Sequence, residues 1–127
     1  MTSFLGSGPG DIGYFPSGAY WKNNVNLGTG LPYTTGDVLG FAINMVGNLT
    51  VFVNNVQAFT IAHGLTGETF PGISDSSTGN ICDMIMNFGS DSSFGGRKEA
   101  QGNPDTGGNG DFYYSPPSGD FLSIKAP

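Results

Sequence analysis

The stretch DVLGFAINMVGNLTVFVNNVQAFTI, residues 37–61, decides the fold. In its first part large apolar side chains share one parity, and small or polar residues take the other. This alternation predicts a strand with one heavy face directed at a core. The large residues are Leu39, Phe41, Ile43 and Met45.

Two turns divide the rest of this stretch. Residues 46–48 contain Gly47 and lead into a second alternating run at 49–53, which predicts an antiparallel hairpin. The pair Asn54-Asn55 can take the left-handed turn geometry. It returns the chain into a third strand at 56–61, so we expect a three-stranded meander.

Shorter β-like runs lie on either side of the meander. Upstream they fall at residues 12–15 and 19–22; downstream they fall at 68–74, 81–88, 112–114 and 121–124. In the run 81–88, Cys82, Met84, Met86 and Phe88 form a uniformly apolar parity that we expect to face the core. Residues 89–110 are expected to be a long polar loop, of the kind that is usually mobile or functional. Together these runs predict an all-β protein, an antiparallel β-sandwich in a single domain spanning 1–127.

The composition disfavours several classes of function. Charged residues make up 11% and the net charge is −6, with four cations in all. Because so few cations cannot form a positive patch, we expect binding to neither nucleic acid nor an anionic membrane surface. The one cysteine implies no internal disulfide, and no apolar run approaches the length of a membrane span. No basic region followed by an apolar stretch marks a secretory signal.

No residue pattern points to catalysis or to a cofactor. His63 is the single histidine and is expected in a loop beside Gly64, while Cys82 lies on an apolar face and should behave as a small hydrophobe. The acidic stretch 103–111 offers oxygen ligands for calcium, but it lacks the spacing of a calcium-binding loop and is expected to be solvated. We therefore predict a non-enzymatic protein with no catalytic residue, cofactor or metal.

Aromatic side chains are the candidate binding residues, because Tyr and Trp offer a large contact area at a small entropic cost. The candidates are Tyr20, Trp21, Tyr33, Tyr113 and Tyr114. If 112–114 is a strand, the rings of Tyr113 and Tyr114 point to opposite faces, and one of them is exposed.

The order of motifs resembles the SPRY-domain sandwich, more narrowly the SPRY-like domains of tailed-bacteriophage structural proteins. The resemblance rests on SFLGSGPGDIGYFPSG, YTTGDVLGFAINMVGNLTVFVNN, LTGETFPGIS, MNFG and GDFYYSPPSGDFLSI, which together span nearly the whole chain. It implies a SPRY/concanavalin-like sandwich that binds partners through loops at one end, here 16–19, 26–32 and 89–110. Family members begin with several further strands before the segment that matches Ser3. We therefore expect the domain to be incomplete at its N-terminus and another subunit to cover the open sheet edge.

The resemblance implies a virion protein of a tailed phage, in a tail, fibre or decoration position. Its partners would be other virion subunits, with a homo-oligomer expected, and it would be found in the phage particle. Two alternatives stay open: a module that binds carbohydrate or a host receptor, and a SPRY adaptor that binds a peptide. An exposed aromatic platform would indicate the first, and an apolar groove with a polar rim the second.

Overall fold

The computed structural model describes residues 5–74 and 83–119. They belong to two compact units, Met1–Cys82 and Asp83–Pro127. The first unit contains two three-stranded antiparallel sheets. Across the described residues there is no helix, and hence none long and apolar enough to cross a membrane. The all-β prediction is confirmed, while the prediction of one domain over 1–127 stays a prediction.

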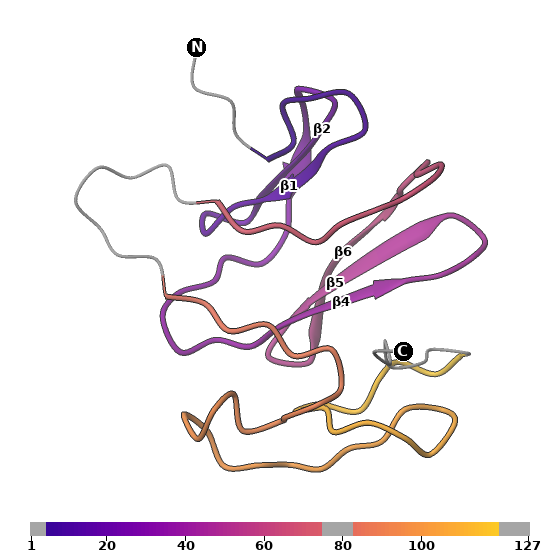
Figure 1. The fold of residues 1–127 in the computed structure, drawn as a ribbon. Helices are drawn as coiled ribbons and strands as arrows, with labels where there is room; N and C mark the ends of the chain where they lie inside the picture. Colours follow the sequence, from indigo (N-terminus) through magenta and orange to yellow (C-terminus); the bar gives the residue numbers. More distant parts are fainter. Residues whose placement is uncertain (1–4, 75–82, 120–127) are drawn as a thin grey trace. The chain divides into compact units, whose positions relative to one another are not determined.

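Each sheet is a simple meander of consecutive strands (Figure 1). The first sheet consists of β1 (Ile12–Tyr14), β2 (Ala19–Lys22) and β3 (Val25–Thr29). The second consists of β4 (Leu39–Ile43), β5 (Asn48–Val53) and β6 (Val56–Ala62). The predicted meander over 37–61 and the two short upstream strands are confirmed, whereas β3 was not predicted.

The first turn of each meander has the same hydrogen-bond pattern. Between β1 and β2, the Phe15 N–H donates to the Ala19 carbonyl at 3.0 Å and the Gly18 N–H donates to the Phe15 carbonyl at 2.8 Å. Between β4 and β5, residues 44, 48 and 47 repeat this pattern at 3.0 and 3.3 Å. The last loop residue is a glycine with positive φ in both cases, 90° at Gly18 and 104° at Gly47. Only glycine adopts that conformation without strain.

The second turn is also shared, and it is an Asn-Asn pair in both sheets. Asn23 and Asn24 have φ of 51° and 64°, and Asn54 and Asn55 have φ of 49° and 68°. Two successive positive φ angles define the type I′ turn, whose twist matches that of the flanking strands. The predicted left-handed geometry at 54–55 is confirmed. Each outgoing strand has a bulge three residues after the turn. In the first sheet Trp21 pairs with Asn26 but Tyr20 pairs with Gly28, which leaves residue 27 as the extra residue. In the second sheet Phe52 pairs with Gln57 but Val51 pairs with Phe59, which leaves residue 58.

The core of the first unit lies between the two sheets. Leu49, Val51 and Phe59 of β5 and β6 are buried, with Val51 fully enclosed. From the first sheet, Ile12, Tyr14 and Tyr20 pack against them. The Tyr20 ring stacks on Phe59 with centroids 4.0 Å apart at 8°, and Tyr14 meets the same ring edge-on at 5.0 Å and 66°. Burial of Leu49, Val51 and Phe59 in this contact stabilises the unit by roughly 1.5–3 kcal/mol for each fully buried side chain.

The predicted core face of β4 is wrong in its burial. Phe41 is 59% exposed, Ile43 50% and Met45 completely exposed, and the buried side chain of this strand is Ala42, of the opposite parity. In register, Phe41 lies opposite Val51 and so shares the core-facing side of the sheet. The side chains of the first sheet pack over β5 and β6 instead, and β4 extends beyond that cover.

The downstream strands are also absent from the described residues. Residues 68–74 and 83–88 have no strand pairing, and in 112–114 there is a single bridge, between Phe112 and Asn103. Positions 81, 82 and 121–124 lie outside the described residues. The side chains expected in the core are exposed instead: Met84 by 45%, Met86 by 43% and Phe88 by 40%. Ile85, of the other parity, is 41% exposed, so burial does not alternate and neither parity faces a core.

The polar loop of the second unit is held by side chains that accept backbone hydrogen bonds. Asn87 Oδ1 accepts three of them, from residues 89, 90 and 91 at 2.8–3.1 Å. Ser92, fully buried, accepts from the N–H groups of Gln101 and Gly102 at 3.0 and 3.2 Å. These bonds satisfy backbone donors that a sheet would otherwise satisfy.

Candidate interaction surfaces

Two of the five predicted binding residues belong to the core-side aromatic cluster of the first unit. Tyr20 stacks on Phe59. The Tyr33 ring lies 5.0 Å from the Tyr14 ring, and the Tyr33 hydroxyl donates to the Tyr14 backbone carbonyl at 3.1 Å. Burial raises the pKa of the Tyr14 phenol above its ordinary value, and that hydroxyl donates to the Leu31 carbonyl. Tyr20 and Tyr33 are thus brought together, half-buried.

Of the other three residues, one belongs to the first unit and two to the second. Trp21 is half-buried in β2 and points to the face opposite Tyr20. Tyr113 and Tyr114 belong to the second unit and meet edge-on at 4.9 Å and 88°, both half-buried. The expected opposition of their rings is therefore wrong, because the segment is not a strand.

The aromatic contacts of the second unit extend to Phe94 and Lys98. The Phe94 ring lies 5.8 Å from that of Tyr113, and the Lys98 ammonium lies 5.5 Å from the Tyr113 centroid. Phe94 has φ of 53°, an uncommon conformation for a bulky residue. The five candidates therefore form no single aromatic platform within either unit.

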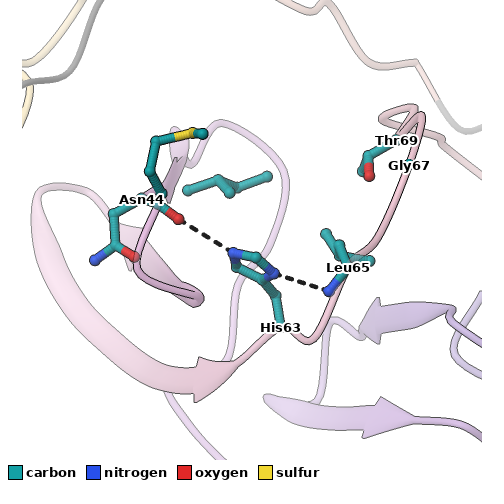
Figure 2. A pocket seen from close by; sticks show the side chains of 7 residues that line it. Asn44, His63, Leu65, Gly67 and Thr69 are labelled. Atoms are coloured by element: carbon teal, nitrogen blue, oxygen red, sulfur yellow. Dashed lines mark hydrogen bonds between the residues drawn. The ribbon is translucent and has the colours of Figure 1, made fainter.

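An open cleft of about 250 Å³ lies beside the end of β6 (Figure 2). Ile43, Asn44, Met45, His63, Leu65, Gly67 and Thr69 line it. The His63 Nδ1 atom accepts the Leu65 N–H at 3.0 Å, so the proton of the neutral ring is on Nε2, which donates to the Asn44 carbonyl at 3.2 Å. Both ring nitrogens hold backbone, and His63 fixes the segment after β6 against the β4–β5 turn.

Two acidic residues of the second unit, Asp91 and Asp105, accept hydrogen bonds from nearby backbone N–H groups. Asp105 is buried, and its Oδ1 accepts the Asn109 N–H at 2.8 Å. The Ser93 hydroxyl, followed by the backbone N–H groups of Gly95 and Ser93, lowers the pKa of the Asp91 carboxyl. One oxygen of Asp111 is buried without a hydrogen-bond partner. Within 5–74 and 83–119, no three His, Cys, Asp or Glu side chains come together as a metal site would require.

The sequence did not reveal how much apolar surface the described residues leave uncovered. Part of it comprises the side chains of Phe41 and Ile43 in β4 and of Met45 and Val46 in the turn that follows, which we call the β4 face. Phe70 is 80% exposed in the extended segment after β6, and the run 84–88 is exposed in the second unit. The alternation of the β4 residues was visible in the sequence, but the side chains that would cover them were not.

Comparison with protein-family models, with curated proteins and with solved structures gave no match to this chain.

Proposed function

We propose that this chain is a non-enzymatic structural subunit that works by burying its uncovered β-surface against other subunits. The observation that carries the proposal is apolar surface that the described residues leave uncovered, at the β4 face and in the unpaired segment that holds Phe70. The side chains of Phe70 and of the β4 face are between 50% and fully exposed to solvent. Contiguous exposed apolar surface is a mark of protein–protein contact sites.

The proposal extends to the fold type and the setting. The antiparallel meanders fit a SPRY/concanavalin-like sandwich, and the sequence motifs resemble those of tailed-phage structural proteins. On that basis the assembly is a virion, with the chain in a tail, fibre or decoration position. Carbohydrate binding has weaker support, because Tyr20 and Tyr33 are engaged with the core cluster while Trp21 lies on the opposite face.

The test is the mass of the species in solution, measured by light scattering at two protein concentrations. A defined oligomer that persists on dilution supports the proposal, and a monomer at both concentrations contradicts it. Phe70→Glu places a charge on the exposed apolar segment and is expected to reduce the mass. Gln57→Glu places the same charge on an exposed polar site of β6 and serves as the matched control, expected to leave the mass unchanged.

A further inference from the structure

The outer edge of β4 carries unpaired backbone groups in a regular series. Val38 and Asn44, which flank the strand, exchange hydrogen bonds with the β5 side: the Asn54 N–H donates to the Val38 carbonyl at 2.9 Å and the Asn44 N–H to the Asn48 carbonyl at 3.0 Å. Hydrogen-bonded and non-hydrogen-bonded pairs alternate along an antiparallel ladder. Even-numbered residues of β4 therefore bond to β5, and the N–H and C=O groups of Leu39, Phe41 and Ile43 point outward.

Nothing in the described part of the chain pairs with that edge. Among residues 5–74 and 83–119, β4 is the terminal strand of its sheet and its only register partner is β5. The strand Leu39–Ile43 contains no charge, no proline and no bulge. These are the devices by which natural edge strands avoid pairing with another chain. An apolar edge without them is a template for an added strand.

We propose that a second copy of this chain pairs with β4 through its own β4, in antiparallel orientation about a twofold axis at Phe41. This inference rests on the proposed function and names the partner at one of its surfaces. In this register Phe41 lies opposite Phe41 of the other copy, and Leu39 lies opposite Ile43. All six outward-pointing residues of the two strands then form hydrogen-bonded pairs, because each is of the outward parity.

Sequence and charge favour this register. The acidic residue nearest the strand, Asp37, lies opposite Met45 of the other copy, so no like charges meet across the axis. Both strands bring apolar side chains on the same side of the joined sheet, as an isologous contact requires. Each chain carries a net charge of −6, so association should strengthen as salt screens the repulsion between the copies.

Apolar side chains are available on both sides of the axis. Within the paired stretch, Phe41 is 59% and Ile43 50% exposed, and in this register they lie on one side of the joined sheet with the same residues of the other copy. Burial of this apolar surface adds to the backbone hydrogen bonds of the joined edge.

The test is site-specific cross-linking in a Cys82→Ser background. Cα atoms in a hydrogen-bonded antiparallel pair are about 5.5 Å apart, within the range of a disulfide. Phe41→Cys should therefore form a disulfide-linked dimer on mild oxidation, and mixing Leu39→Cys with Ile43→Cys should form the mixed dimer. Met45→Cys is the matched control: it is more exposed than Phe41, but the proposed register places the two copies of residue 45 far apart. It should cross-link at less than about a tenth of the rate.

A backbone substitution gives an independent readout. Ile43→Pro removes an outward N–H that bonds nothing in the described chain, so the fold of the unit should persist while the pairing is blocked. We expect at least a tenfold weaker self-association with an unchanged unfolding midpoint. Equal cross-linking of Met45→Cys and Phe41→Cys, or an unaltered oligomer of Ile43→Pro, would overturn the inference. If the oligomer persists without the Phe41 cross-link, the β4 pairing is wrong and the proposed function stands; a monomer at all concentrations refutes both.

Discussion

Phe59 is the side chain on which both sheets of the first unit depend. It is 7% exposed, stacks on Tyr20 and meets Tyr14 edge-on. Truncation of a buried Phe to Ala costs about 3–5 kcal/mol, and each aromatic pair adds about 0.5–1.5 kcal/mol. Domains of this size have a free energy of unfolding of about 5–15 kcal/mol. Phe59→Ala should therefore remove a large part of the stability of the first unit.

The assay is urea unfolding followed by the fluorescence of Trp21, the single tryptophan of the chain, which lies in β2. With a slope of about 2 kcal/mol per molar urea, a loss of about 4 kcal/mol lowers the midpoint by roughly 2 M. Phe70→Ala is the matched control, because that ring is 80% exposed and its loss should cost less than about 0.5 kcal/mol. Comparable losses for the two variants would refute the placement of Phe59 at the centre of the core.

Three further predictions concern the backbone and the pH dependence of the same unit. Gly13→Ala should unfold the N-terminal part of the first sheet, because a Cβ there would lie 1.9 Å from the Leu5 carbonyl oxygen. The Cβ of Gly40→Ala would meet the Phe52 side chain at an ordinary contact distance of 3.5 Å, so that variant should change the urea midpoint little. Asn54→Ala should lower the free energy of unfolding by about 1–2 kcal/mol, because it removes the side-chain hydrogen bonds to the Val38 N–H and to Asp37 and leaves a positive φ without its favoured residue. Asn55→Gly should be tolerated, because glycine adopts a positive φ without strain. Thermal unfolding of the two variants distinguishes these outcomes. Burial raises the pKa of the Tyr14 phenol. The stabilisation that depends on the neutral phenol is therefore fully present below its ordinary pKa of about 10 and is lost as the pH rises through the folded-state pKa. Tyr14→Phe should reduce this alkaline loss in a series of urea midpoints measured at increasing pH.

The sequence was informative where local chemistry decides the structure. The meander at 37–61 was predictable because alternation, a glycine turn and an Asn-Asn turn all agree over one short stretch. The β2–β3 hairpin carries the same Asn-Asn signal at 23–24, with the same positive φ angles. It is harder to recognise because Gly28, a residue type more typical of turns than of strands, lies inside β3.

The candidate sites were harder to predict because they depend on distant partners. Alternation assigned Phe41 and Ile43 to one side of β4 but could not reveal that the first sheet covers only β5 and β6. Tyr20 and Tyr33 were selected for their residue type, and the structure places both with Phe59 and Tyr14. The role of His63 in holding Leu65 and Asn44 left no trace in the sequence beyond a single histidine at a strand end.

The segments that failed to become strands are explained by the same dependence. A run such as 83–88 has strand-like composition, but β-propensity measures how well a side chain packs on a pleated surface next to a partner, and an isolated extended segment gains nothing from it. In the described residues neither 68–74 nor 83–88 has a neighbour on its edge. Their apolar side chains therefore stay exposed, and so do the outward groups of β4. Where the described residues leave strand-forming sequence unpaired, we expect the pairing partner in another chain. Cross-linking at Phe41 tests this expectation at one such place, the outer edge of β4.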